Sequence, residues 1–244
     1  MRKHNEDLKE KLKLHVLDCT NKTMKCGKFG LPEIFCPKID LPDYIALCDR
    51  PGEFNKTDKT IVGSFLYDNK FDTDHCLFMC IYHNDEKKLN DFINKYKNVK
   101  YFIETDRSQV GDVEEALNLV KRYMSRVEAL WITLFMDKLV VPLITYSNED
   151  SFSYMLDGIE KTVVVCFSTK GSMLEKTENE LLIKAISYTV DNLKFLKSII
   201  VYSTCSDDNT IYETFKYATE KGIDIIIPDN SLMKWNRIKN GKND

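Results

Sequence analysis

Residues 162–202 read TVVVCFSTKGSMLEKTENELLIKAISYTVDNLKFLKSIIVY, and this stretch decides the fold. Thr162–Phe167 and Ser198–Tyr202 are short apolar runs without a polar face, a pattern that predicts strands covered on both sides. Between them, apolar residues recur at helical spacing from Leu181 to Leu193. A strand, a helix and a second strand in this order predict a parallel βαβ unit.

The same alternation extends outward from this unit, from about residue 60 to residue 228. The other expected strands are Ile61–Tyr67, Cys76–Tyr82, Val99–Ile103, Leu139–Tyr146 and Ile223–Pro228. The expected helices are Glu86–Lys97, Asp112–Phe135 and two that open at the capping boxes Thr177-x-x-Glu180 and Thr210-x-x-Glu213. About seven strands with intervening helices predict a TIM-barrel-like parallel sheet, complete or distorted, with a doubly wound open sheet as the alternative. Pro142, inside one strand, favours an edge or a bulge there.

Three regions differ in composition along the chain. Residues 1–59 combine a weak helical pattern with a stretch rich in Pro, Gly and Cys, and we expect this irregular segment to pack on the main domain. The α/β domain is expected to span residues 60–233. Residues 234–244 are expected to form a basic tail.

Composition excludes a largely disordered chain, because 43% of the 244 residues are hydrophobic. The net charge of -3 argues against a strongly basic nucleic-acid protein. That charge is unevenly spread, however. Residues 1–28 carry eight Lys and Arg against four Asp and Glu, and residues 234–244 carry four against one. The basic ends are either solvated tails or a contact for an anionic partner.

The first residues are charged and no apolar segment follows them, so we expect no signal peptide, a cytoplasmic location and mostly free thiols. The most apolar stretch is Val127–Tyr146. Glu128, Asp137 and Lys138 interrupt it, so we expect no membrane span.

Acidic side chains and one histidine follow two neighbouring expected strands. His83 and Asp85 follow the second strand, and Glu104 and Asp106 follow the third. A ligand binds at the carboxyl ends of the strands in either architecture. There these carboxylates can transfer protons or bind a divalent ion, with His83 as a base or ligand. Alternatively they are N-caps of the following helices, which fits Asp85 well.

Two hydroxyl-rich loops follow later strands, Phe167-Ser-Thr-Lys-Gly-Ser172 and Tyr202-Ser-Thr-Cys-Ser206. Small side chains let backbone N–H groups approach an anion, and Lys170 adds positive charge. Paired late-strand loops form the phosphate site of many barrels, although such loops are also ordinary turns. The residues expected to bind a ligand are Tyr146, Ser168, Thr169, Lys170, Gly171, Ser172, Tyr202, Ser203 and Asp229.

The cysteines form two groups with different expectations. Cys76 and Cys80 lie in an expected strand, where about 13 Å would separate them, so we interpret them as core residues rather than metal ligands. Four more cysteines fall in irregular chain, with six, nine and eleven residues between them and no C-x-x-C knuckle. Zinc binding and free thiols both stay open for Cys19, Cys26, Cys36 and Cys48.

Residues 140–159 read VVPLITYSNEDSFSYMLDGI, and residues 163–171 read VVVCFSTKG. These segments, with Phe29-Gly-Leu-Pro32 and Tyr202-Ser203, resemble the family catalogued as domain of unknown function 4417. The resemblance covers roughly residues 27–230. The family usually has Trp where Tyr146 stands, and paired aspartates near His83-Asn84-Asp85.

The resemblance carries no established activity. It implies a phage or mobile-element accessory protein in the cytoplasm of low-GC Gram-positive bacteria.

Three functions fit the sequence. The first is an enzyme or binder of a phosphate-bearing ligand, either a nucleotide or a nucleic-acid end, at the strand carboxyl ends. The second is a non-catalytic protein of a mobile element that acts on a replication or host-defence component. The third is a nucleic-acid accessory factor that uses the basic termini. The sequence contains no G-x-S-x-G, H-E-x-x-H, G-x-G-x-x-G or Walker pattern, and no motif indicates a cofactor.

Overall fold

Seven parallel strands form two sheets in the computed structural model, which describes residues 8–71, 73, 76–173 and 175–241. The first sheet consists of β3 (Tyr44–Leu47), β4 (Thr60–Gly63), β5 (Tyr101–Ile103) and β6 (Leu139–Val141). The second consists of β7 (Val164–Ser168), β8 (Ser198–Tyr202) and β9 (Asp224–Ile226). Every neighbouring pair in these two sheets is parallel. The predicted parallel α/β fold is therefore confirmed.

Single bridges join the two sheets at both of their seams. Leu143, just after β6, pairs with Cys166 of β7, and Tyr44 of β3 pairs with Asp229, just after β9. The strands thus follow one another in a ring, but in the described residues no continuous ladder closes it. The arrangement is a distorted, incomplete version of a TIM-barrel-like sheet.

Both faces of strands β3 to β8 are largely buried, which explains why their sequences lack a polar face, whereas Asp224 of β9 is exposed. An inner core inside the ring contains Ile45, Leu47, Ile61, Ile103, Val141, Val164, Cys166, Ile200 and Tyr202, among others. An outer core between strands and helices contains Tyr44, Ala46, Val62, Phe102, Val140, Val165, Phe167, Ile199 and Val201. The two lists alternate along each strand, as side chains of a strand must.

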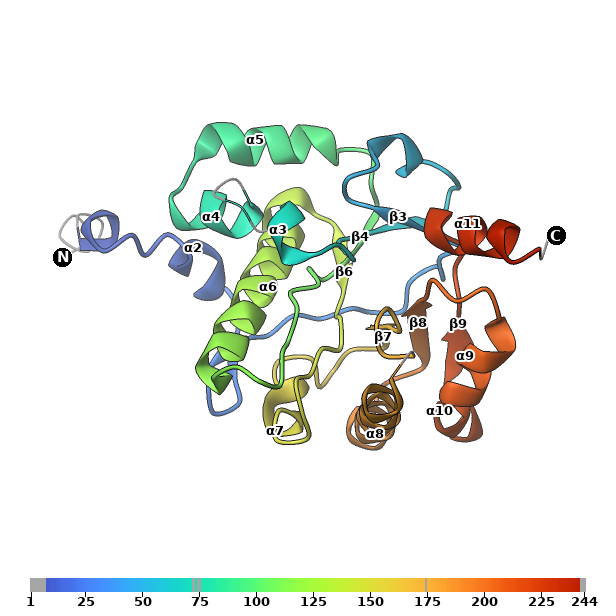
Figure 1. The fold of residues 1–244 in the computed structure, drawn as a ribbon. Helices are drawn as coiled ribbons and strands as arrows, with labels where there is room; N and C mark the ends of the chain where they lie inside the picture. The colour runs from blue at the N-terminus through green and yellow to red at the C-terminus, as the bar shows by residue number, and fades with distance from the viewer. Residues whose placement is uncertain (1–7, 72, 74–75, 174, 242–244) are drawn as a thin grey trace.

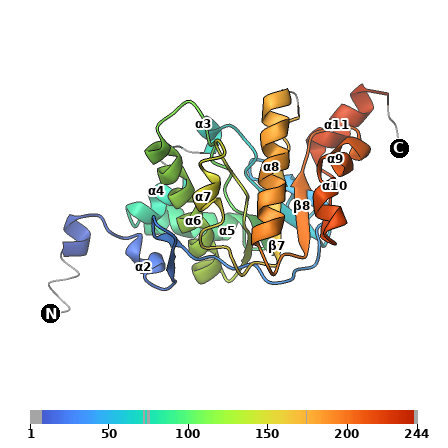
Figure 2. The same cartoon turned by 90° about the horizontal axis from the view of Figure 1, so that it is seen from below.

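The helices divide between the two halves of the ring (Figures 1 and 2). Beside the first sheet lie α3 (Asp68–Phe71), α4 (Leu77–Tyr82), α5 (Glu86–Lys95) and α6 (Glu115–Met136). Beside the second lie α8 (Lys176–Asn192), α9 (Asp208–Thr214), α10 (Lys216–Glu220) and α11 (Ser231–Lys239). The remaining elements are α2 (Leu17–Thr20), β1 (Lys25–Cys26), β2 (Leu31–Pro32), η1 (Pro51–Glu53) and α7 (Phe152–Met155). Within the described ranges, no helix combines the length and the apolar character needed to cross a membrane.

The prediction of a strand at Cys76–Tyr82 is wrong, because this run forms helix α4. Cys76 is its N-cap, and its Sγ accepts a hydrogen bond from the Met79 amide at 3.5 Å. A continuous apolar run of this length fits a buried strand or a buried helix equally well, so periodicity alone does not separate them. Cys76 and Cys80 are therefore one helical turn apart, and both are buried.

The structure corrects three further expectations. Strand β3 lies in the stretch expected to be irregular, and all four of its residues are buried. The two helices expected to begin at capping boxes have Glu175 and Asp207 as N-caps, so neither Thr177 nor Thr210 has that role. Residues 234–239 of the expected tail belong to helix α11.

Strand β6 ends before Pro142, in agreement with the edge or bulge expected there. A buried carboxylate, that of Glu104, accepts the next backbone N–H group. The Leu143 amide donates to Glu104 Oε2 at 3.0 Å, and Arg126 Nη1 of α6 donates to the same oxygen at 2.9 Å. The side chains of Glu104 and Arg126 are 2% and 0% exposed. This contact fixes α6, the end of β5 and the seam between the sheets to one another.

We expect the substitution Arg126→Met to lower the free energy of unfolding by about 3–5 kcal/mol, because it leaves the carboxylate of Glu104 buried without its charged partner. Urea denaturation measures this loss. The matched control is Lys184→Met, which removes the ion pair with Glu149, two side chains that are 54% and 62% exposed. We expect it to cost less than about 1 kcal/mol. Equal losses in the two variants would contradict the structural role of Arg126.

Candidate functional site

An aromatic pair fills the mouth of the ring at the strand carboxyl ends. The rings of Phe65 and Tyr202 stack with centroids 3.9 Å apart, and both side chains are buried. Gly63, the last residue of β4, permits this packing, because a Cβ there would lie 2.6 Å from the Phe65 ring. The axis of the ring, where a barrel usually holds its ligand, is thus occupied by side chains.

The two hydroxyl-rich loops lie side by side, because β7 and β8 are neighbours, and their polar groups bond to one another. Thr169 Oγ1 donates to Ser203 Oγ at 2.8 Å, and both residues are buried. Lys170 Nζ donates to the Phe65 carbonyl at 3.0 Å and lies 4.9 Å from the centre of the Tyr67 ring. These contacts stabilise the loops, and anion binding by them stays a prediction.

The other residues expected to bind a ligand lie apart from this point. A hydrogen bond joins the side chains of Tyr146 and Ser172, and burial raises the pKa of Tyr146. Gly171 adopts a φ of 91° with open space around it. Asp229 forms ion pairs with Lys234 at 3.0 Å and Arg237 at 3.3 Å.

The expected cluster of acidic residues does not form. His83 is the C-cap residue of α4, and Asp85 is the N-cap of α5, where its side chain accepts from the Lys88 amide. Neither residue follows a strand, because the preceding segment is helical. Glu104 is occupied by the ion pair at the seam.

Asp106 does lie at the mouth of the ring, as its position after β5 predicted. Its amide donates to Ser64 Oγ at 3.0 Å. Burial raises the pKa of the Asp106 carboxyl to about 7, the negative charge of Asp68 raises it further, and Lys170 opposes the shift. Asp106 in turn helps to raise the pKa of Tyr202, after the larger effect of burial. Three of the expected site residues therefore influence one another here.

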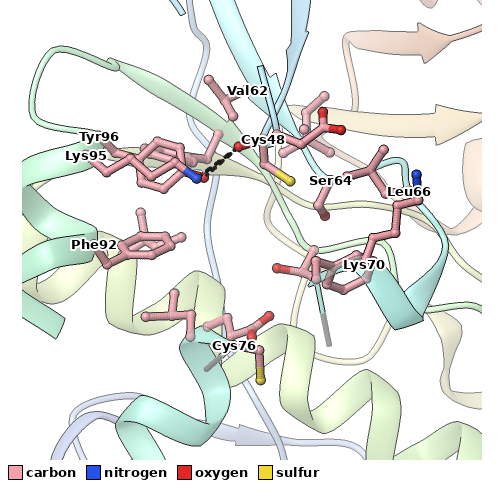
Figure 3. A pocket seen from close by; sticks show the side chains of 18 of the residues that line it. Cys48, Val62, Ser64, Leu66, Lys70, Cys76, Phe92, Lys95 and Tyr96 are labelled. Atoms are coloured by element: carbon pink, nitrogen blue, oxygen red, sulfur yellow. Dashed lines mark hydrogen bonds between the residues drawn. The ribbon is translucent and has the colours of Figure 1, made fainter. Parts of the chain in front are cut away.

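A cavity of about 300 Å³ lies beside this filled mouth, which we call the lateral pocket (Figure 3). It opens between the carboxyl ends of β3, β4 and β5 on one side and helices α3 to α6 on the other. Aromatic side chains of Phe71, Phe92 and Tyr96 contribute to its walls. Figure 3 shows Phe92 and Tyr96 across the pocket from Leu66 and Lys70.

Glu128 of α6 brings a carboxylate into the apolar wall of the lateral pocket. Its side chain is only 3% exposed. Oε1 accepts from Arg107 Nη2 at 2.7 Å and from the Phe78 amide, in the first turn of α4, at 2.9 Å. Oε2 is also buried, and the carboxylate interacts with the Thr105 hydroxyl as well. Burial raises the pKa of Glu128, while Arg107, the Thr105 hydroxyl and the Phe78 amide lower it.

Two exposed lysines also line the lateral pocket, Lys70 of α3 and Lys95 of α5. Lys95 Nζ donates to the Cys48 carbonyl at 3.0 Å, a contact drawn in Figure 3. Burial raises the pKa of the Cys48 thiol to about 11, so this cysteine is protonated at neutral pH. A protonated thiol is a poor nucleophile.

A family model described as Domain of unknown function (DUF4417) matches residues 25–219. The chain belongs to this family. The match includes every element that forms the lateral pocket, and the family's description names no activity. Comparison with curated proteins and with solved structures gives no match.

The four N-terminal cysteines of this DUF4417 protein do not converge. Cys36 lies in the inner core, Cys19 lies in the outer core, and Cys48 packs against the outer core. In the described ranges, no group of three or more His, Cys, Asp or Glu residues is arranged to hold a metal ion. This separation contradicts a zinc site built from Cys19, Cys26, Cys36 and Cys48.

Sequence reasoning missed Glu128 as a site residue of this DUF4417 protein, although one signal was present. Glu128 is a charged residue inside the apolar run Val127–Trp131 of the longest helix, and in sequence it only argued against a membrane span. A carboxylate on a buried helix face requires a partner or a ligand. Lys70 and Lys95 gave no such signal, because they resemble the many other exposed lysines.

We expect Asp106→Asn to stabilise the protein at pH 8 and to change little at pH 4. In the folded protein the pKa of the Asp106 carboxyl is about 7, above its ordinary value of 3.8. Between these two pH values the unfolded chain ionises this carboxyl more readily than the folded protein does, so the wild type loses stability as the pH rises. A change of about 1 kcal/mol in the free energy of unfolding shifts Tm by about 2–4 °C for a chain of this size. We therefore expect the Tm of Asp106→Asn at pH 8 to be several degrees higher than that of the wild type.

Thermal unfolding from pH 4 to pH 8 measures the difference between the Asp106→Asn variant and the wild type. The control is Asp112→Asn, which changes an exposed aspartate. A Tm difference that does not grow with pH, or one that Asp112→Asn reproduces, would show that Asp106 is not held in its neutral form.

Proposed function

We propose that this DUF4417 protein binds a phosphate-bearing small molecule of the nucleotide class in the lateral pocket. The observation that carries the proposal is a cavity of about 300 Å³ beside the strand carboxyl ends, whose lining combines aromatic side chains with two exposed lysines. An apolar pocket with a few convergent polar groups is the usual form of a small-molecule site.

The size and walls of the lateral pocket favour a flat ring as the buried part of the ligand. Ligand pockets span roughly 300–1,000 Å³, and this one lies at the lower limit. Phe71 and Phe92, both half-buried, present aromatic surface against which a planar ring can pack, whereas the ring of Tyr96 is already stacked on Phe54. A nucleobase meets both conditions, and its sugar and phosphate then extend toward solvent.

The lysines of the lateral pocket favour a phosphate on that exposed part. Lys70 and Lys95 are both exposed, and each ammonium has three donors, of which Lys95 uses one for the Cys48 carbonyl. A phosphate oxygen accepts charge-assisted hydrogen bonds from such groups. This location differs from the loop after β7 that the sequence indicated, although both lie at strand carboxyl ends.

We also propose that the protein acts in the bacterial cytoplasm as an accessory protein of a phage or mobile element. The sequence resemblance over residues 140–171, which implies this context, motivates the proposal, whereas the description of the matched family names no context.

Nucleotide binding by isothermal titration calorimetry tests the proposed function. We expect Lys95→Gln to weaken the binding of a nucleoside monophosphate about tenfold, because a charge-assisted hydrogen bond is lost, and to leave the binding of the matching nucleoside unchanged. The control is Lys87→Gln on the same helix, which does not line the lateral pocket. If no nucleotide binds at millimolar concentration, the proposal fails, and a non-catalytic interaction protein becomes the better description.

A further inference from the structure

An exposed acidic residue lies at the rim of the lateral pocket, shortly after strand β3. Asp49 contributes to the lining of the pocket and is exposed to solvent. A ligand that enters the pocket from solvent therefore passes this side chain. Asp49 differs in this respect from Glu128, whose carboxylate is buried in the opposite wall.

The backbone places Asp49 beside one of the two lysines of the lateral pocket. The Cys48 carbonyl accepts hydrogen bonds from Lys95 Nζ at 3.0 Å and from the Tyr96 hydroxyl at 3.4 Å, and Figure 3 shows the first of these contacts. Asp49 is the next residue in the chain. Its negative charge helps to raise the pKa of the Cys48 thiol and of Tyr96, in addition to the larger effect of burial. Asp49 and Lys95 therefore lie at the same edge of the pocket.

A negative charge at this edge is unfavourable for a ligand that offers only a phosphate there, because like charges at short range repel each other. A carboxylate accepts hydrogen bonds and donates none. Asp49 therefore favours a ligand with neutral donors between its buried ring and its phosphate. In a ribonucleotide that part is the ribose, whose adjacent 2′- and 3′-hydroxyls can both donate to one carboxylate. Acidic side chains bind ribose hydroxyls in this way in dinucleotide-binding folds.

We propose that Asp49 binds the ribose of the nucleotide in the lateral pocket and selects ribonucleotides over 2′-deoxyribonucleotides. The base packs against Phe71 and Phe92, the ribose hydroxyls donate to Asp49, and the phosphate lies toward Lys95. This order leads from the half-buried aromatic residues to the exposed rim. The inference rests on the proposed function, because it concerns the sugar of the nucleotide bound there.

The first test compares adenosine monophosphate with 2′-deoxyadenosine monophosphate on the wild-type protein by isothermal titration calorimetry. The two ligands have the same base and the same phosphate, so Phe92 and Lys95 contribute equally to both. We expect the ribonucleotide to bind about tenfold more tightly, because the 2′-hydroxyl donates to a charged acceptor. The comparison needs no variant.

The second test removes the carboxylate with Asp49→Ala. Because Asp49 is exposed, we expect the variant to keep its fold, which thermal unfolding checks. We expect the preference for the ribonucleotide to fall to within about twofold, since both hydroxyls lose their acceptor. The matched control is Asp58→Ala, an exposed aspartate between β3 and β4 that does not line the lateral pocket, and it should keep the wild-type preference.

A divalent ion held between Asp49 and the phosphate is the alternative role for this carboxylate, because Mg²⁺ binds both groups. Such an ion would make binding depend on Mg²⁺ and would treat the two sugars alike. We expect adenosine monophosphate to bind the wild type with the same affinity in Mg²⁺ and in EDTA. Loss of binding in EDTA would contradict ribose binding by Asp49.

The results also separate this inference from the proposed function. If the two monophosphates bind the wild type with equal affinity, nucleotide binding stands and selection by Asp49 is wrong. If neither binds, the proposed function is wrong and the selection falls with it. A preference for the ribonucleotide that persists in folded Asp49→Ala would assign the selection to another residue.

Discussion

One oxygen atom, Glu104 Oε2, links the end of β5 to helix α6 and to Leu143, the residue whose bridge to Cys166 joins the first sheet to the second. It accepts the Leu143 amide, which Pro142 and the departure of β6 leave without a ladder partner, and it also accepts Arg126 of α6. A buried ion pair contributes little net stability, but an arrangement that separates its two charges is strongly destabilised. The orientation of α6 against the end of β5 therefore follows from this contact.

The lateral pocket depends on the same pairing of segments. Arg107 lies three residues after Glu104, and Glu128 lies two residues after Arg126, so a second ion pair forms between the same loop and the same helix. In the first pair, Glu104 Oε2 also accepts the Leu143 amide. The second pair places the carboxylate of Glu128 in the wall of a cavity. Because Phe65 and Tyr202 fill the axis of the ring, this cavity lies beside the axis rather than on it.

The strands with continuous apolar runs were predictable, and β8 has the predicted bounds Ser198–Tyr202. Strand β3 is not predictable from the sequence, because its four apolar residues stand between segments rich in Pro, Gly and Cys. Helix α4 resembles a strand in the sequence, because an apolar run of seven residues shows neither a helical nor a strand period. The position of Asp106 at the strand carboxyl ends was predictable because it lies three residues after β5. The ion pair of Glu128 was not predictable from spacing, because its partner Arg107 is 21 residues away in the sequence.

The position of the bound ligand tests the central claim most directly. Ile132 lines the lateral pocket, whereas Ile200 lies in the inner core on the axis of the ring. In a protein labelled with ¹³C at the isoleucine δ-methyl groups, titration with adenosine monophosphate should shift the Ile132 resonance and leave that of Ile200 in place. A shift of Ile200 with no change at Ile132 would place the ligand on the axis and contradict the account.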